Sequence, residues 1–282
     1  MRRCQRAPNA AAAQALSLRS FAAARARSLS DVTGIRAETF VREYVASDLA
    51  AFGKCLRDAE GRRREAAVAA TAHSVADATA LSKQYYGVGP VQSEPEIAAL
   101  IEMAAKNGAS TVCEIGAHDA GTTILFSRVL KPDFLLVMDL YVKNRWRLRR
   151  DAPPGQRVRA VDGDSSHPWT QARARRKLGG RHIDLLLIDG DHSWDGVKRD
   201  FLRYRGLVRP GGLIAFHDIC VSRPESGGWS GDVPAFWRLV RSLYPHEEFI
   251  TDPHQDGLGI GVIRYSPAVP VSVVIETAPP ST

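Results

Sequence analysis

Short apolar runs alternate with longer amphipathic stretches through the middle of the chain. The runs lie at Thr111–Ile115, Phe134–Leu140, Val158–Val161, Ile183–Ile188 and Leu213–Phe216. Short runs of this kind, bounded by turn-forming residues, are typical of strands that are buried on both faces. Strands that alternate with helices predict parallel βαβ units, so the pattern indicates an α/β fold with a doubly wound sheet.

The rhythm of the sequence changes near its end. Glu247–Thr251 and Leu258–Arg264 are separated by the turn-rich residues Asp252–Gly257. Two apolar segments joined in this way predict an antiparallel hairpin. We therefore predict a Rossmann-like fold whose seven-stranded sheet is mostly parallel and includes a terminal antiparallel strand.

Helical periodicity precedes the predicted sheet. Apolar residues recur every three to four positions in Arg36–Leu56, and an Ala-rich stretch, Arg64–Leu81, follows. We expect residues 31–90 to form an N-terminal helical region that acts as a lid or as the contact of a homo-oligomer. Ser93 and Glu96 have the spacing of a capping box and predict the start of the helix that leads into the first strand.

Composition divides the chain into a folded part and polar ends. The 282 residues are 44% hydrophobic, enough for one catalytic domain, residues 91–266, and a smaller accessory region. The net charge of +7 comes mostly from residues 1–30, which hold six arginines and no acid. We interpret them as a disordered basic extension, with an organelle transit peptide as the alternative. The Pro-, Ser- and Thr-rich residues 267–282 predict a disordered tail.

Cysteine spacing and hydropathy bear on the compartment. The four cysteines are widely separated and form no CxxC pair, which favours reduced thiols in a cytoplasmic protein. No apolar run reaches the ~18 residues that a membrane-spanning helix needs. We therefore expect a soluble protein that has no membrane partner.

A glycine turn follows the first predicted strand. Gly116 and Gly121 lie between that strand and the next helix, and Glu114 precedes the first glycine by two positions. Such a turn lets the backbone approach a ligand closely, but it lacks the third glycine of the dinucleotide fingerprint. Asp139 ends the second strand, where a carboxylate can accept both hydroxyls of a ribose.

Two longer motifs carry a family resemblance. The segments IDGDHSWDGVKRD, residues 188–200, and LVRPGGLIAFHD, residues 207–218, resemble methyltransferase domain 24 proteins, the family of the cephalosporin-hydroxylase and rhamnosyl O-methyltransferase types. The resemblance covers about Gln92 to Tyr265 and implies a class I fold that binds S-adenosylmethionine. The cofactor-binding residues that it implies are Glu114, Gly116, Gly121, Asp139, Asp164, Ser165 and Asp189, with Asp164 and Ser165 beside the adenine.

The resemblance also suggests a divalent metal. In the similar catechol and caffeoyl-coenzyme A methyltransferases, an Asp after the fourth strand and an acidic pair after the fifth hold the ion; Asp189 and Asp218 match these positions. His217 departs from the pattern. It is either a third metal ligand, with Mn²⁺, Fe²⁺ or Zn²⁺ tolerated better than Mg²⁺, or a base or supporting group, or no metal binds. His192 lies where the caffeoyl-coenzyme A type has a lysine and is a candidate general base.

These observations predict O-methylation of a small-molecule hydroxyl, such as that of a natural product, sugar or phenol. Asp189, His192 and His217 are the predicted catalytic residues, and Ser222–Asp232, with Trp229, is a candidate acceptor lid, or a connection whose Asp232 caps the next helix. The alternatives are a non-catalytic partner of another biosynthetic enzyme and a nucleic-acid methyltransferase. Because no RNA-binding module is recognised in the sequence, a nucleic-acid partner is not expected. The basic runs behind the last alternative are Lys143, Arg145, Arg147, Arg149, Arg150, Arg173, Arg175, Arg176 and Lys177.

Overall fold

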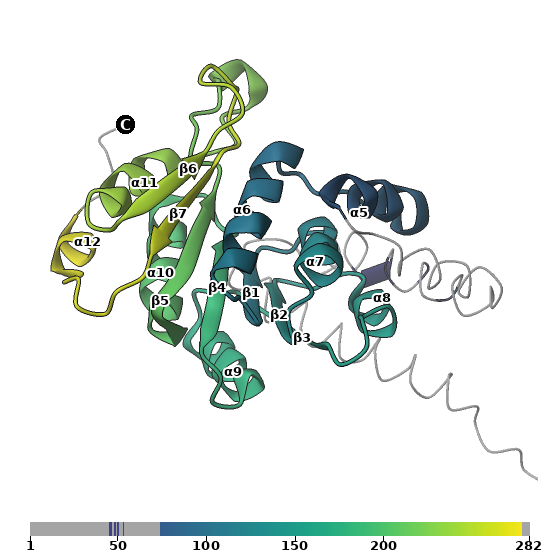
Figure 1. The fold of residues 1–282 in the computed structure, drawn as a ribbon. Coiled ribbons are helices and arrows are strands. Elements are labelled where there is room, and N and C mark those ends of the chain that lie inside the picture. Colours follow the sequence, from purple (N-terminus) through teal and green to yellow (C-terminus); the bar gives the residue numbers. More distant parts are fainter. Residues whose placement is uncertain (1–44, 47, 49, 51–52, 54–73, 278–282) are drawn as a thin grey trace, which may run out of the picture. The chain divides into compact units, whose positions relative to one another are not determined.

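The computed structural model describes residues 45–46, 48, 50, 53 and 74–277 (Figure 1). The chain divides into two compact units, Met1–Arg57 and Asp58–Thr282, and the predicted sheet lies in the second. The predicted basic extension lies outside the described residues, as do most of the helix predicted for Arg36–Leu56 and residues 64–73 of the next one.

Seven strands form one sheet in the order β3-β2-β1-β4-β5-β7-β6. Strands β1 to β5 are parallel to one another, and β7 is antiparallel to both β5 and β6, as predicted. The strands are β1 Thr111–Ile115, β2 Phe134–Asp139, β3 Arg157–Asp162, β4 Ile183–Ile188, β5 Val208–His217, β6 His246–Phe249 and β7 Ile260–Arg264. The structure therefore confirms the Rossmann-like sheet that the apolar runs predict.

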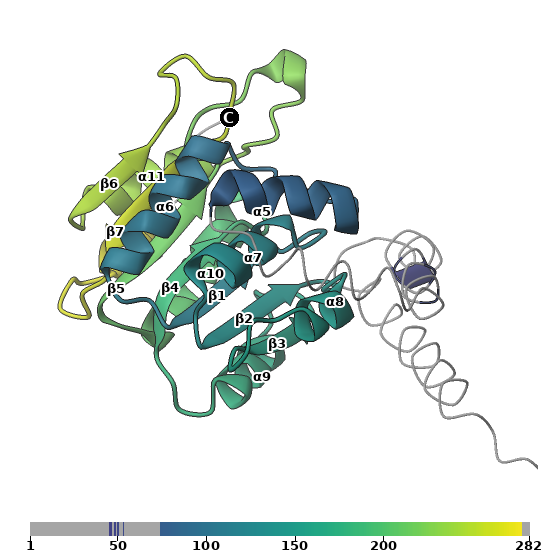
Figure 2. The same ribbon diagram turned by 45° about the vertical axis from the view of Figure 1, so that its right-hand side comes forward.

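Helices cover both faces of this sheet (Figures 1 and 2). On one face lie α5 Val75–Leu81, α6 Glu94–Lys106, α7 Gly121–Leu125 and α8 Arg145–Arg150. On the other lie α9 Pro168–Leu178, α10 Trp194–Tyr204, α11 Val233–Arg241 and α12 Ser272–Glu276. Shorter helical turns are η2 Ser82–Tyr86, η3 Phe126–Leu130, η4 Arg205–Leu207 and η5 Pro224–Ser226.

Side-chain alternation along the strands separates the two hydrophobic cores. In β1, Val112 packs under α6 and α7, whereas Cys113 and Ile115 belong to the core under α9 to α11. Successive strand residues point to opposite faces, so a strand of wholly apolar sequence supplies both cores at once. This is why the central strands read as unbroken apolar runs.

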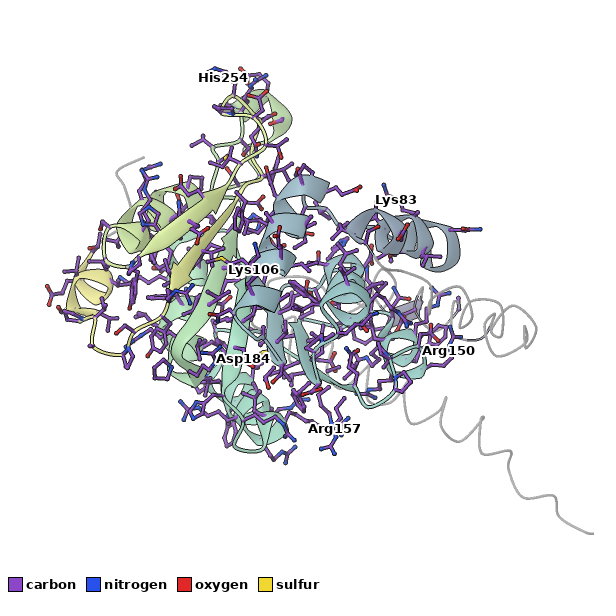
Figure 3. All side chains as sticks on the ribbon, viewed as in Figure 1. Lys83, Lys106, Arg150, Arg157, Asp184 and His254 are labelled. Carbon is purple, nitrogen blue, oxygen red and sulfur yellow. The ribbon has the colours of Figure 1, made fainter. Side chains whose placement is uncertain are left out.

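The predicted capping box at the start of α6 is wrong, although the helix begins where it was expected. The Ser93 side chain makes no capping bond and instead contacts the Thr251 hydroxyl at 2.8 Å. The Glu96 carboxylate accepts hydrogen bonds from the backbone amides of Thr251, at 3.0 Å, and Gly259, at 2.9 Å. Both side chains thus tie the helix start to the β6–β7 connection, which His254 marks in Figure 3.

The prediction of a disordered tail is also wrong for part of residues 267–282. Ser272–Glu276 form α12, and Val274 is fully buried in the core under α9 to α11. Val269 and Val271 pack against the same core. The valines between the prolines therefore supply enough apolar surface to fold this segment back onto the domain.

Across the described residues, no helix combines the length and the apolar character needed to cross a bilayer.

Truncation of Phe201 tests the core under α10. Its fully buried ring lies 5.9 Å from the ring of Phe216 and 6.0 Å from that of Phe236, measured between centroids. We expect Phe201→Ala to lower the free energy of unfolding in urea by ~3–5 kcal/mol, because it leaves a cavity beside the fifth strand. Trp169→Ala, at a side chain that is 75% exposed, should change it by less than about 0.5 kcal/mol. Equal effects of the two changes would contradict this account of the core.

Candidate active site

The carboxyl ends of the parallel strands bring the predicted site residues to one edge of the sheet. The glycine turn follows β1, Asp139 ends β2, and Asp189 follows β4. His217 ends β5 and Asp218 follows it. Ligands of open α/β sheets bind at this edge, so the topology alone explains why these distant residues meet.

Gly116 is required by the close approach of β1 and β4. Its φ is +88°, and a side chain there would clash with the carbonyl group of Asp189. Its amide donates to the Met138 carbonyl at 2.9 Å, which fixes the turn against β2. The absent side chain therefore lets the ends of three strands converge.

Gly121, which the sequence assigns to the cofactor, makes a close contact with the chain itself. A side chain at Gly121 would clash with the backbone of Gly89 and Pro90, which passes over the start of α7. Within the turn, His118 and Ala120 have φ values of 46° and 70°. Non-glycine residues in this region are strained, and such strain is common at functional turns.

A protonated carboxyl group lies beneath the glycine turn. Burial raises the pKa of Glu114 to about 8, although the Thr123 hydroxyl donates a hydrogen bond to the carboxylate. The negative charges of Asp189 and Asp139 contribute to the rise. At neutral pH Glu114 therefore holds a proton that a cationic ligand group can displace.

Asp139 borders the glycine turn, as expected. Its Oδ2 accepts from the backbone amide of His118 at 2.8 Å, and Oδ1 accepts from that of Tyr141 at 3.1 Å. Burial raises the pKa of Asp139, and these two hydrogen bonds oppose that rise. The carboxylate is thus held in one orientation between the first two loops of the edge.

The loop after β3, which the sequence places beside the adenine, is supported from α10. Asp164 accepts from the amide of Ser166 at 2.8 Å, and the Tyr204 hydroxyl donates to the Ser165 carbonyl at 3.0 Å. Asp200 lies next to this loop and is 1% exposed. Burial, together with the charges of Asp164 and Asp191, raises the pKa of Asp200 to about 7. Sequence reasoning missed Asp200 and Tyr204, because on an amphipathic helix they read as packing positions.

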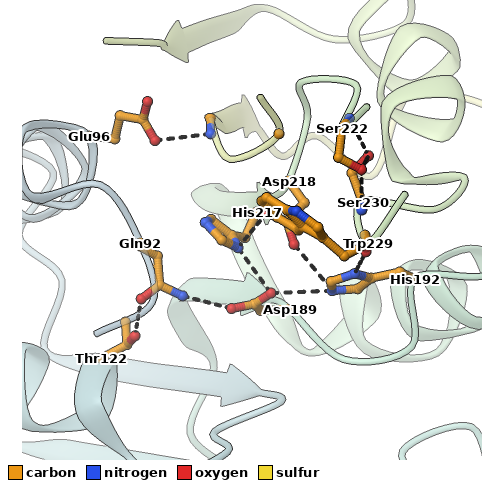
Figure 4. A network of polar contacts seen from close by, with 12 residues as sticks. Gln92, Glu96, Thr122, Asp189, His192, His217, Asp218, Ser222, Trp229 and Ser230 are labelled. Carbon is orange, nitrogen blue, oxygen red and sulfur yellow. Dashed lines mark hydrogen bonds and ion pairs between the residues drawn. The ribbon is translucent and has the colours of Figure 1, made fainter. Parts of the chain in front are cut away.

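Two aspartates and two histidines form a compact cluster at the ends of β4 and β5 (Figure 4). His217 Nδ1 lies 3.1 Å from Oδ1 of both Asp189 and Asp218. His192 Nε2 lies 3.5 Å from Asp189 Oδ1 and 3.3 Å from Asp218 Oδ2. Each histidine therefore faces both carboxylates.

Charge pairing sets the protonation of this cluster. Burial alone would raise the pKa of Asp189, but the charges and hydrogen bonds of His217 and His192 hold it at about 2. Burial would lower the pKa of both histidines, yet Asp189 and Asp218 raise it to about 9 in His192 and about 10 in His217. Asp189 is therefore ionised, and both imidazoles hold a second proton at neutral pH.

The two histidines differ in access. The side chain of His217 is 2% exposed, whereas that of His192 is 28% exposed. His192 Nδ1 lies 2.7 Å from the Trp229 carbonyl, to which it must donate. This hydrogen bond fixes the ring and directs Nε2 toward the carboxylates, where it can bind a proton or a metal ion only after the ring loses its second proton.

The candidate lid is attached to the same histidine. The backbone amide of Asp232 donates to the His192 carbonyl at 2.8 Å. The Asp232 carboxylate, expected to cap α11, instead accepts from the amide of Trp194 at the start of α10, at 2.9 Å. Ser222–Asp232 is therefore joined to His192 through both its carbonyl and its ring.

The donor set of the cluster fits a divalent cation. Carboxylate oxygens of Asp189 and Asp218 and a ring nitrogen of His192 lie within 4.8 Å of one another. Oxygen donors suit hard divalent ions, and imidazole is accepted by Mn²⁺, Fe²⁺ or Zn²⁺. The geometry thus groups His192 with the carboxylates where the sequence placed His217. His217 instead bridges the carboxylates through Nδ1, and its buried Nε2 has no hydrogen-bond partner among the described residues.

The basic runs lie on α8 and α9, at the β3 edge of the sheet, where Figure 3 shows Arg150 and Arg157. Several of these cations bind local acceptors: Lys143 pairs with Asp119, Arg145 with Asp162 and Arg150 with Asp151, and Arg173 donates to the backbone carbonyl of Asp162. Part of the positive charge is therefore neutralised within the domain.

The pKa of Asp200 gives a stability prediction. Because its pKa is raised from 3.8 to about 7 in the folded protein, stability is fully present below about pH 4 and is lost as pH rises through 7. Asp200→Asn should remove this loss and raise the free energy of unfolding at pH 9 by on the order of 3 kcal/mol. Urea unfolding at several pH values measures it, with Asp195→Asn on the exposed face of α10 as the matched control. Parallel curves for Asp200→Asn and the unmodified chain would refute the assignment.

Comparison with known proteins gives a family match for part of the chain. Residues 98–219 match a family model described as a methyltransferase domain. Among curated proteins, the uncharacterized protein y4gI of Sinorhizobium fredii is 32% identical over 78 residues. This match covers 28% of the chain but only 8% of y4gI, so the chain corresponds to a small part of that protein.

Several solved structures are similar at low sequence identity. The O-methyltransferase TomG from Streptomyces achromogenes, in complex with S-adenosylmethionine, is 16% identical and covers 68% of this chain and 89% of its own, with a TM-score of 0.49. Cofactor-bound Rv0187 from MTB is 18% identical, with coverages of 67% and 88% and a TM-score of 0.49. An O-methyltransferase from Bacillus cereus is 16% identical, with coverages of 68% and 89% and a TM-score of 0.44.

The family match covers the part of the chain that contains these motifs and strands β1 to β5. The match begins within α6 and ends just after His217 and Asp218. It therefore includes the glycine turn, Asp139 and the acid–histidine cluster. Residues 98–219 are therefore similar to a methyltransferase domain.

Proposed function

We propose that this protein transfers the methyl group of S-adenosylmethionine to a hydroxyl group of a small molecule. The observation that carries the proposal is the position of His192, whose Nε2 lies 3.5 Å from Asp189 and 3.3 Å from Asp218 at the edge that also holds the glycine turn. An imidazole oriented between two carboxylates suits removal of a hydroxyl proton, which oxygen acceptors require. In such a transfer the acceptor oxygen would bond to the methyl carbon in line as the carbon–sulfur bond breaks, with S-adenosylhomocysteine as the leaving group.

The cofactor side of the site consists of the loops that follow β1, β2 and β3. Glu114 would ionise beside the ammonium group of the methionine part, since a nearby cation lowers the pKa of a buried carboxyl. Asp139 would accept from the ribose hydroxyls, because its backbone hydrogen bonds leave further lone pairs on both oxygens. Asp164 and Ser165 would contact the adenine from a loop that Tyr204 holds in place.

His192 is the proposed general base. Nε2 accepts the hydroxyl proton when the ring is neutral, a form that a cation held by Asp189 and Asp218 would favour, because it would lower the pKa of His192 from about 9. The Trp229 carbonyl keeps the ring in the orientation that this step needs. His217 is too deeply buried to meet an acceptor, so we assign it the task of holding both carboxylates in place.

Asp189 and Asp218 are the proposed ligands of a divalent cation. Bound beside an acceptor hydroxyl, such an ion would lower the pKa of that hydroxyl. Asp218 has a φ of 63°, a conformation that aspartate tolerates better than most residues and that turns its backbone at the site. With the carboxylates assigned to the ion and Nε2 of His192 to the proton, the two groups perform separate tasks.

The acceptor would enter beside Ser222–Asp232. Trp229 is 37% exposed, and its ring packs so closely on Gly257 that a side chain there would clash with it. The backbone carbonyl of Trp229 binds the proposed general base, so the exposed indole lies near it and is suited to contact an apolar acceptor surface. We propose that this loop is the acceptor lid.

The other functional hypotheses have less support. The partial neutralisation of the basic runs argues against a nucleic-acid substrate, for which an open basic face is expected. A non-catalytic partner would not need the ordered cluster of His192 and the two aspartates. Residues 31–90 as a lid or homo-oligomer contact, the domain limits 91–266 and a cytoplasmic location remain proposals.

Asp139→Ala tests the cofactor assignment. We expect the dissociation constant of S-adenosylhomocysteine, measured by calorimetry, to rise by roughly 10–100-fold, because hydrogen bonds from the ribose to a charged group are lost. Asp133→Ala, which removes an exposed acid at the opposite end of β2, should leave the constant unchanged. An unchanged affinity in Asp139→Ala contradicts the assignment.

His192→Gln and Asp218→Asn test the proposed reaction. With labelled S-adenosylmethionine and a panel of phenol, sugar and polyketide hydroxyls, His192→Gln should lower kcat by about 10²–10⁴-fold without weakening Mn²⁺ binding. Asp218→Asn should weaken Mn²⁺ binding. A large loss of Mn²⁺ affinity in His192→Gln would reassign His192 as a metal ligand. Methyl transfer to nucleic acid alone, or to no acceptor despite cofactor binding, would overturn the proposed function.

A further inference from the structure

Gln92 connects the start of α7, next to the glycine turn, to the acid–histidine cluster, although it precedes the residues that match the methyltransferase domain. Its side-chain Nε2 donates to Asp189 Oδ2 at 2.7 Å, and its Oε1 accepts from the hydroxyl of Thr122 (Figure 4). The residue is 7% exposed. One buried amide therefore joins the first turn of α7 to the end of β4.

The chemistry of its partners fixes the orientation of this amide. Asp189 Oδ2 lies 2.7 Å from the side-chain amide of Gln92, and a carboxylate accepts hydrogen bonds. The amide nitrogen of Gln92 must therefore face Asp189, and its oxygen must face the Thr122 hydroxyl. The opposite orientation would bring two acceptors together at Asp189 and leave both without a proton to share.

The backbone around Gln92 is held on both sides. Before it, Gly89 and Pro90 pack directly against Gly121 at the start of α7. After it, Ser93 and Glu96 bind Thr251, at 2.8 Å and 3.0 Å respectively. The amide is thus presented by an anchored segment, as a group that orients another side chain should be.

We propose that Gln92 is a positioning residue that orients Asp189 as a cation ligand; this inference rests on the proposed function of Asp189. The two histidines contact only Oδ1 of Asp189. The carboxylate group is fixed against rotation when Oδ2 also has a hydrogen-bond partner. Gln92 supplies that second hold. Without the amide, the carboxylate can turn about its side-chain bond and loses the orientation that the histidines and Asp218 share.

The hydrogen bonds of Gln92 also link the proposed cation site with the glycine turn. Thr122 lies in the first turn of α7, directly after the glycine turn. A ligand that orders this turn also orders the Thr122 hydroxyl, the Gln92 amide and Asp189 in succession. Cofactor product and cation should therefore bind with positive linkage, which by thermodynamic reciprocity is the same in both directions.

Gln92→Met tests the proposal, because methionine keeps the length of the side chain and removes both hydrogen bonds. The probes are Mn²⁺, followed by electron paramagnetic resonance, and S-adenosylhomocysteine, followed by calorimetry. We expect Mn²⁺ affinity to fall by roughly 10–100-fold, as for other residues that orient metal ligands, and the linkage between the two ligands to disappear. Thr122→Val should abolish the linkage with a smaller loss of Mn²⁺ affinity, and Thr122→Ser, which keeps the hydroxyl, should restore both.

Gln156→Met is the matched control. Gln156 also makes a pair of opposed hydrogen bonds, accepting from Ser127 at 2.6 Å and donating to the Pro132 carbonyl at 2.9 Å, but away from the cluster. It should lower thermal stability without changing Mn²⁺ affinity. Unchanged Mn²⁺ affinity in a folded Gln92→Met protein overturns the proposal, as does a loss of the same size in Gln156→Met. Absence of Mn²⁺ binding by the unmodified chain also overturns it, whereas Mn²⁺ binding without methyl transfer refutes only the proposed function.

Discussion

The organisation of the site depends on keeping one buried carboxylate ionised. Burial by itself disfavours the charge on Asp189, and an uncompensated charge at that depth would cost several kcal/mol or take up a proton. His217 and His192 compensate it on one oxygen, and Gln92 satisfies the other. Because all three partners come from different segments, the charge fixes those segments relative to one another.

Glycine makes this arrangement sterically accessible. The carbonyl of Asp189 occupies space that a side chain at Gly116 would need, so the end of β4 can lie against the turn after β1 only because that side chain is absent. Gly121 does the same for the segment that leads to Gln92. Both glycines therefore bring polar groups of the chain into hydrogen-bonding distance. This role is additional to the close approach of a ligand that a glycine turn suggests.

Much of the fold and part of the site could be predicted from periodicity and motif. Every apolar run became a strand, because burial on both faces leaves little choice of residue in a parallel sheet. Asp189, His192, His217 and Asp218 could be found because they follow strands whose ends must meet. Gln92 could not, since its partner Asp189 lies 97 positions away and a glutamine before a helix carries no signal of its own.

The errors share a physical cause. A local pattern such as the Ser93 and Glu96 spacing predicts a local bond, yet tertiary contact offered Glu96 two backbone amides of the β6–β7 connection instead. The prolines and serines of residues 267–282 predict disorder, whereas the helix Ser272–Glu276 buries Val274 in the core. In both cases a side chain found a more favourable partner far away in sequence, which composition and spacing do not encode.

The proposed roles of the two histidines are distinguished by their access and not by sequence or basicity. Both face the same carboxylates, and those carboxylates raise the pKa of both. A proton acceptor for substrate must also be reachable, and only His192 retains exposed surface and an anchor on the candidate lid. His217 is almost completely buried and contacts two carboxylates, so its position is fixed and it offers an acceptor almost no surface. Under the proposed function, the two histidines would therefore divide the work, one for proton transfer and the other for holding the carboxylates in place.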